Sequence, residues 1–213
     1  MDYAKAFTFV FDDEDWVKKV LTGGIVAMIP IVNLIVVGYG LTVLRNVAEG
    51  REKALPEWED FGDYFVQGLM SFLGGLIWAV PIILLLMLMG LISWVTGYEG
   101  DPYGVAGPVW LCMSGLSCLS GLYGLFLAAL IPAATTKYAV SRDFATFFRV
   151  AEIFKYIKSN LGPYIIALLL GTVAGFIASF GLILCLVGVV FTGFWASLVC
   201  NYLLGQVYAA GEP

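Results

Sequence analysis

Charged residues fall in short clusters along the chain, and long apolar runs separate these clusters. Four runs contain no Asp, Glu, Lys or Arg: residues 20–44, 64–98, 102–136 and 159–211. A helix that crosses a bilayer needs about 20 apolar residues. The second and third runs are therefore predicted to hold one span each. The fourth is predicted to hold two spans, with a turn at residues 181–188.

The first run, residues 20–44, allows two interpretations. Pro30 and Asn33 lie in its middle; proline breaks helices and asparagine suits turns. The 13 residues 17–29 would form about 20 Å of helix, which is shorter than the ~30 Å hydrocarbon core. We expect a re-entrant hairpin whose tip at 30–33 is covered by the rest of the bundle, because lipid offers no partner to non-helical backbone. The alternative is a single proline-kinked span, which would give five spans in all.

The positions of lysine and arginine favour the hairpin. If the first run returns, all 11 basic residues lie on one side of the membrane, within residues 1–19, 45–63 and 137–158. The connector 99–107 on the other side carries only Glu99 and Asp101. Because basic residues concentrate on the cytoplasmic side, we expect both termini in the cytoplasm and the protein in the cytoplasmic membrane.

Aromatic amphipathic segments precede three hydrophobic stretches, at residues 11–19, 56–67 and 144–160. We interpret them as helices that lie in the cytoplasmic interface with their apolar face in lipid. Together with the stretches they precede, they give three units, 11–48, 56–136 and 144–209, of one membrane domain covering 1–213. The predicted interface anchors are Trp16, Trp58, Phe61, Phe65, Phe144, Phe147, Phe148 and Phe154.

These patterns predict an all-α membrane protein with four transmembrane helices, a re-entrant N-terminal helical hairpin and cytoplasmic interfacial amphipathic helices. Composition agrees, since 61% of the residues are hydrophobic and 13% are charged, against about 25% charged in a soluble domain. The net charge of −5 argues against a nucleic-acid-binding protein. The expected partners are membrane lipids, together with other membrane proteins or a second copy of the chain.

Small residues recur at helical spacing within the fourth run. Gly171, Gly175 and Ser179 lie four residues apart, and so do Gly193 and Ser197. Such ladders let helices approach closely in lipid. We expect them to serve packing within the bundle rather than homodimerisation, because a four-span bundle needs these contacts itself.

The residue types that carry catalysis or bind metals are scarce. Histidine is absent, and the four cysteines lie inside apolar runs without a Cys-x-x-Cys pair. Acidic residues cluster at 12–15 and 57–63 beside basic ones, which is typical of a solvated, ion-paired surface. We therefore expect no catalytic residue, no cofactor, no metal and no disulfide, and we do not expect an enzyme.

One set of polar residues inside the apolar runs remains a candidate site. Pro30, Asn33, Asn201 and Gln206 are candidates for a buried polar site. Broken helices around such a site are a device of transporters. The alternative is that Asn33 only satisfies backbone groups of the turn.

Several short motifs occur together along the chain. They are Gly23-Gly24, Gly38-Tyr39-Gly40, Arg45-Asn46-Val47, Leu55-Pro56-Glu57-Trp58-Glu59-Asp60-Phe61 and Tyr202-Leu203-Leu204-Gly205-Gln206-Val207-Tyr208, after an acidic segment that ends at Trp16. With these motifs the chain resembles the prokaryotic domain-of-unknown-function family 4013, and Leu-Pro-Glu-Trp is the most specific piece. The resemblance implies a bacterial or archaeal multi-pass membrane protein and no particular activity.

The functional expectation rests on what the sequence contains and lacks. We expect a non-enzymatic integral membrane scaffold or accessory subunit that packs against other membrane proteins. The alternative is a passive transporter, channel or lipid-handling protein for a neutral or amphipathic solute.

Overall fold

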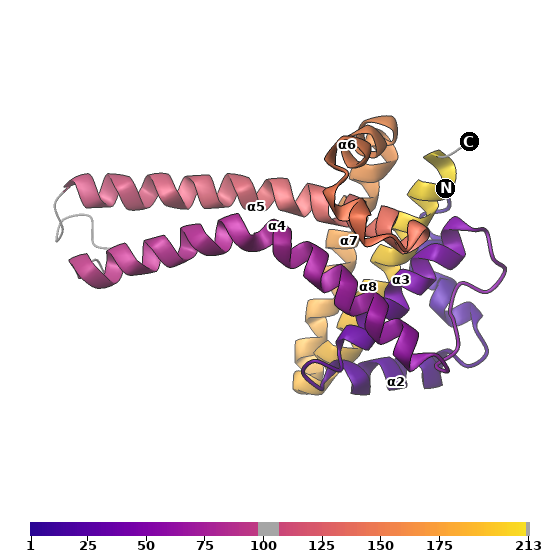
Figure 1. Cartoon of the computed structure of the whole chain (residues 1–213). Helices are drawn as coiled ribbons and strands as arrows, with labels where there is room; N and C mark the ends of the chain where they lie inside the picture. The colour runs from indigo at the N-terminus through magenta and orange to yellow at the C-terminus, as the bar shows by residue number, and fades with distance from the viewer. Residues whose placement is uncertain (98–106, 212–213) are drawn as a thin grey trace. The chain divides into compact units, whose positions relative to one another are not determined.

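The computed structural model describes residues 1–97 and 107–211, without the side chains of 107–108 and 183–187, and these residues contain helices and no strand. Figure 1 shows the helices in chain order. Their bounds are α1 Lys5–Thr8, η1 Phe9–Asp12, α2 Trp16–Ala27, α3 Leu34–Ala48, α4 Phe61–Thr96, α5 Gly107–Ser141, η2 Phe144–Phe148, α6 Val150–Ser159, α7 Leu161–Ser179, η3 Phe180–Leu184 and α8 Cys185–Gly211.

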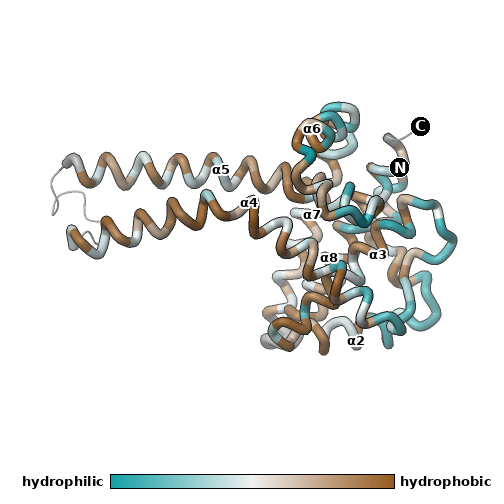
Figure 2. Tube along the Cα trace, in the orientation of Figure 1, coloured by the Kyte–Doolittle hydropathy of each residue, from teal (hydrophilic) through white to brown (hydrophobic). Residues whose placement is uncertain are grey.

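Four helical stretches are long and apolar enough to cross a membrane. They are Phe61–Thr96, Val109–Ser141, Leu161–Leu182 and Gly188–Gly211. Figure 2 shows brown, apolar residues along most of α4. The prediction of an all-α membrane protein with four spans is thus confirmed. The turn expected at 181–188 coincides with η3 and the start of α8, whereas the connector 99–107, with Glu99 and Asp101, lies almost wholly outside the described residues.

The chain divides into two compact units. Unit 1 consists of Met1–Leu73 and Pro132–Pro213, and unit 2 consists of Gly74–Ile131. The division does not follow the three expected units of one domain, because it cuts α4 after Leu73 and α5 before Pro132. Unit 1 is therefore built from two separate stretches of the chain, and unit 2 is a single helical hairpin inserted between them.

Helices of unit 1 approach each other closely at glycines. A Cβ atom at Gly38 of α3 would overlap the backbone carbonyl of Tyr64 in α4, and one at Gly68 would overlap the carbonyl of Leu34. On the other side of the unit, a Cβ at Gly23 of α2 would overlap the ring of Phe194 in α8. Small residues at these crossings bring the helix backbones into contact.

The N-terminal apolar run forms two short helices with a break between them. The helices α2 and α3 are 12 and 15 residues long, or about 18 Å and 22 Å. In the break, Ile31 has a positive φ of 72°. The turn satisfies its own backbone, since the N–H groups of Asn33 and Leu34 donate to the carbonyls of Ile29 and Ile31.

The aromatic segments differ from their expected helical form. Residues 56–60 are not helical and α4 begins at Phe61, so Trp58 does not share a helix face with Phe61 and Phe65. Residues 144–160 form two helices that meet at Arg149, whose ψ of 63° ends η2. Phe147, Ile153 and Tyr156 are buried inside the protein, so Phe147 is not on the apolar face that was expected to meet lipid, whereas Phe148 and Phe154 are exposed.

Candidate functional site

The motif Leu55-Pro56-Glu57-Trp58 contacts three helices in unit 1. The hydroxyl of Tyr39, in α3, donates to the carbonyl of Pro56 at 2.9 Å, and that of Tyr64, in α4, donates to the carbonyl of Glu57 at 2.6 Å. Trp58 stacks on Tyr39 with ring centroids 4.1 Å apart, and its Nε1 donates to the carbonyl of Lys19 in α2 at 3.0 Å. The motif therefore joins α2, α3 and α4.

Lys19 is a buried cation beside this motif. Only 4% of its side chain is exposed, and its Nζ lies 2.7 Å from carboxylate oxygens of both Asp13 and Glu57. Burial lowers the pKa of Lys19, but the hydrogen bonds and negative charges of the two carboxylates outweigh it and raise the pKa above its ordinary value. Lys19 is therefore a charged structural partner rather than a neutral base.

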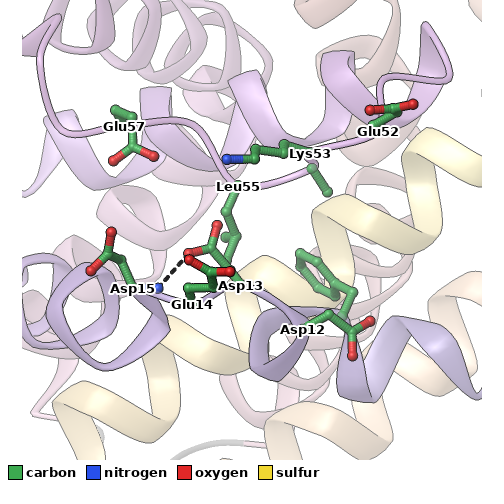
Figure 3. Close-up of a pocket in the computed structure, with 10 residues that line it drawn as sticks. Asp12, Asp13, Glu14, Asp15, Glu52, Lys53, Leu55 and Glu57 are labelled. Atoms are coloured by element: carbon green, nitrogen blue, oxygen red, sulfur yellow. Dashed lines mark hydrogen bonds between the residues drawn. The ribbon is translucent and has the colours of Figure 1, made fainter.

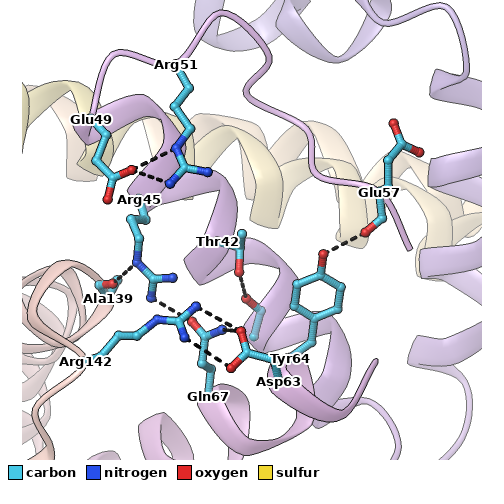
Figure 4. A network of polar contacts seen from close by, with 11 residues as sticks. Thr42, Arg45, Glu49, Arg51, Glu57, Asp63, Tyr64, Gln67, Ala139 and Arg142 are labelled. Carbon is cyan, nitrogen blue, oxygen red and sulfur yellow. Dashed lines mark hydrogen bonds and ion pairs between the residues drawn. The ribbon is translucent and has the colours of Figure 1, made fainter. Parts of the chain in front are cut away.

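A second polar network connects α3, α4 and the end of α5 (Figure 4). Arg45 donates from Nε to the carbonyl of Ala139 at 2.6 Å and from Nη2 to Oε1 of Gln67 at 2.8 Å. Gln67 in turn donates to Asp63 at 2.6 Å, and Arg142 holds Asp63 with two bonds of 2.9 and 3.2 Å. Burial and then the positive charge of Arg142 lower the pKa of Arg45 below its ordinary value.

A polar hollow of about 510 Å³ opens beside this network. Its basic lining residues are Arg45, Arg51, Lys53 and Arg142, and its acidic ones are Glu57, Glu59, Asp60 and Asp63. Several of these charges are already matched, because Arg51 pairs with Glu49 at 2.6 Å and Glu57 pairs with Lys19.

A neighbouring hollow of about 250 Å³ is mainly acidic (Figure 3). The carboxylates of Asp12, Asp13, Glu14, Asp15, Glu52 and Glu57 line it, together with Lys53. Figure 3 shows Asp12 and Glu52 well apart from Asp15 and Glu57. Among the described residues, no three His, Cys, Asp or Glu side chains converge in a way that could hold a metal ion.

The structure does not bring the four residues of the expected buried polar site together. Pro30 and Asn33 are exposed, as is Ile31 between them. The expectation that the rest of the bundle covers this tip is therefore wrong. Local hydrogen bonds satisfy the turn, which removes the physical need for cover. Asn201 lies elsewhere, against Gly40, with its amide donating to Ser197, and Gln206 donates to the carbonyl of Asp2.

The predicted membrane anchors divide into two groups. Phe61, Phe148 and Phe154 expose 38–54% of their surface. Phe147 is instead buried, with its ring centroid 5.3 Å from that of Tyr138. The remaining anchors, Trp16, Trp58, Phe65 and Phe144, are half-buried.

The predicted packing ladders are used only in part. Gly171 lies against the Sγ atom of Cys200, across the contact between α7 and α8. Gly175 and Ser179 are exposed, and Gly193 has open space beside it, while Ser197 is half-buried. The buried residues of α7, which packs against α8, are instead Tyr164 and three alanines: Ala167, Ala174 and Ala178.

Sequence reasoning missed Lys19, Arg45 and Gln67 as buried polar residues. Lys19 and Arg45 are the two charges that directly flank the first apolar run, so their positions could have marked them as residues at the edge of the core. Gln67 carries the only amide group in the first turns of the second run, but its partners come from distant segments.

Comparison with known proteins gives one match. The model of a family described as "protein of unknown function (DUF4013)" matches residues 22–187. No curated protein and no solved structure matches the chain.

Proposed function

The chain belongs to the DUF4013 family, and we propose that the protein is a non-enzymatic membrane scaffold or accessory subunit that packs against other membrane proteins. Because the family has no known function, the proposal rests on the residues of the chain itself. The observation that carries the proposal is a face of small residues on α7 that the described side chains of unit 1 leave exposed. This face consists of Thr172, Gly175 and Ser179, and we call it the small face.

The small face has the properties of a helix–helix contact surface. All three residues are exposed, and a Cβ at Gly175 would meet nothing within 4 Å. The hydroxyls of Thr172 and Ser179 donate to carbonyls of their own helix at 2.9 and 2.6 Å, so neither group needs water. A flat surface of this kind lets another helix approach closely, which is the main source of helix association in lipid.

Large apolar side chains border the small face. Leu169 and Phe176 expose 62% and 67% of their surface. The buried alanines of α7, Ala167, Ala174 and Ala178, lie on a different side of the helix from the small face, so a partner helix on the small face would leave the internal packing unchanged.

Native mass spectrometry of the protein, extracted gently from its own membrane, tests this proposal. We expect a stoichiometric membrane-protein partner with wild type and its loss with Gly175→Leu, because leucine would separate the two helices. Gly90→Leu is the matched control, since Gly90 in α4 also has open space beside it. A lone monomer, or a complex that survives Gly175→Leu, would contradict the proposal.

We also infer the topology of the N-terminal hairpin. Neither α2 nor α3 reaches the ~30 Å of a hydrocarbon core, and α2 exposes an apolar row of Val17, Leu21 and Ile25. Insertion from one face of the cytoplasmic membrane, with both termini in the cytoplasm, accounts for both features. Reporters fused at Met1 and after Lys155 should then report the same side, and opposite sides would contradict the re-entrant hairpin.

The exposed aromatic residues near α6 support a related proposal for the membrane interface. Phe148 and Phe154 expose 54% and 38% of their surface, while Arg149, Lys155 and Lys158 surround them. A short helix with this distribution lies at the boundary of headgroups and acyl chains.

A further inference from the structure

The polar hollow beside Arg45 contains an unmatched positive charge. Only 7% of Arg45 is exposed, and its Nε and Nη2 bond to neutral oxygens of Ala139 and Gln67. In the described part of the chain, no carboxylate lies within ion-pair distance of Arg45 and its Nη1 has no hydrogen-bond partner.

The surrounding network does not neutralise this charge. The two carboxylates whose charge acts on Arg45 already have partners: Arg142 holds both oxygens of Asp63, and Glu49 pairs with Arg51. Gln67 links Arg45 to Asp63 without adding charge. Arg45 and Arg142 therefore share one hydrogen-bonded carboxylate. Of these side chains only Arg45 is largely removed from water, where an unpaired charge is costly.

Arg142 lines the hollow, where its guanidinium pairs with Asp63. Arg142 follows α5 with a positive φ of 55°, a conformation that suits glycine or asparagine better than arginine. Its N–H closes the helix end by donating to the carbonyl of Tyr138 at 2.8 Å. Figure 4 shows the guanidinium groups of Arg45 and Arg142 on the same side of the network.

We propose that this hollow binds a phosphate group, with Arg45 and Arg142 as its donors. Guanidinium groups recognise phosphate oxygens through charge-assisted, often bidentate hydrogen bonds. The hollow, at about 510 Å³, has room for a phosphate and the glycerol attached to it. Four carboxylates also line the hollow. Glu57 and Asp63 pair with Lys19 and Arg142. Glu59 and Asp60 are exposed, so water and salt screen them far more than the buried Arg45.

Two sources could supply the phosphate, a lipid headgroup or a soluble phosphate ester. The full-length protein, delipidated in a neutral detergent, is tested with both. In one arm, native mass spectrometry compares retention of phosphatidylglycerol with that of diacylglycerol, which lacks the phosphate. In the other arm, glycerol phosphate is titrated and the midpoint of thermal unfolding is recorded. Retention of phosphatidylglycerol alone identifies the lipid, and a shift with glycerol phosphate identifies the soluble ester.

Matched variants connect binding to the hollow. Arg142→Asn should weaken binding about tenfold, since it removes a charged hydrogen bond to phosphate while asparagine tolerates the backbone conformation. Arg149→Asn is the control, because Arg149 is similarly exposed and paired, to Asp143 at 2.8 Å, but does not line the hollow. Equal affinity of Arg142→Asn and wild type, or equal retention of both lipids without a response to glycerol phosphate, would overturn the proposal.

Discussion

The helices α8 in unit 1 and α4, most of which lies in unit 2, bury very different shares of their apolar surface. The most apolar window of α8 has a mean hydropathy of 1.4 and 44% of it is buried inside the chain, whereas the corresponding window of α4 has a mean hydropathy of 2.6 and none of it is buried. Hydropathy is therefore highest where the chain covers a helix least. For a helix in lipid this is reasonable, because lipid covers apolar residues as well as protein does.

Buried polar residues divide between the units in the same way. Ser120 is the one buried polar residue described in unit 2. Unit 1 contains all the other described ones: Lys19, Arg45, Asn46, Gln67, Ser71, Thr136, Thr146 and Asn160. Unit 1 thus depends on specific hydrogen bonds and ion pairs, while unit 2 depends on apolar length and on the pairing of two helices. Three substitutions test this difference.

The largest effect is expected from Gly38→Leu. The Cβ atom alone would overlap the backbone of Tyr64, so α3 and α4 would have to separate, and we expect a loss of about 3 kcal/mol or more in the free energy of unfolding. Unfolding in mixed micelles measures this loss. Gly121→Leu, at an open position on α5 of unit 2, should change the same quantity by less than about 0.5 kcal/mol, and equal losses would remove the distinction between the units.

Lys19→Met should have the second-largest effect, a loss of about 3 kcal/mol in the free energy of unfolding, because it leaves the partly buried Asp13 without its cation. The pKa of folded Lys19 lies above its ordinary value of 10.5. Its contribution is therefore complete below pH 10.5 and disappears as the pH rises through the folded pKa. The midpoints of thermal unfolding of the wild type and of Lys19→Met, measured at increasing pH, should converge only at alkaline pH. Convergence near neutral pH would contradict the ion pairs.

Trp58→Leu should have the smallest effect of the three, about 2 kcal/mol, from the lost stacking on Tyr39 and the lost hydrogen bond to the carbonyl of Lys19. Trp94→Leu is its counterpart near the end of α4, where tryptophan is 82% exposed, and it should leave stability nearly unchanged. Quenching of tryptophan fluorescence by a lipid-soluble probe gives an independent measure: Trp94 should be quenched strongly and Trp58 weakly.

The spans were predictable because they depend on composition over about 20 residues. Charge-free runs located all four, and Pro30 with Asn33 located the break between α2 and α3. The bounds of the aromatic segments were less predictable, because tertiary contacts decide them. Trp58 stays outside a helix since it stacks on Tyr39, which is 19 residues away in the sequence.

The polar networks could not be read from the chain, for a related reason. Arg45 contacts Gln67 and Ala139, which are 22 and 94 residues away, and no local pattern records such pairings. The Leu-Pro-Glu-Trp motif indicated an important segment, but not that its backbone carbonyls would accept hydrogen bonds from two tyrosines. Small-residue spacing likewise gave no indication of which side of α7 would face α8.

The insertion of unit 2 into the middle of unit 1 has a consequence for the timing of biosynthesis. The helix α8, which packs on α2, α3 and α7, is synthesised after all three of them. At about 5–20 residues per second, α2 and α3 would wait roughly 10–30 s for it. During that interval the ring of Phe194 does not yet pack against Gly23, and the hairpin of α2 and α3 has only some of its final neighbours. Unit 2, whose two helices are consecutive, can form in the meantime, so a nascent chain arrested on the ribosome before α8 should contain one finished hairpin and an unfinished remainder.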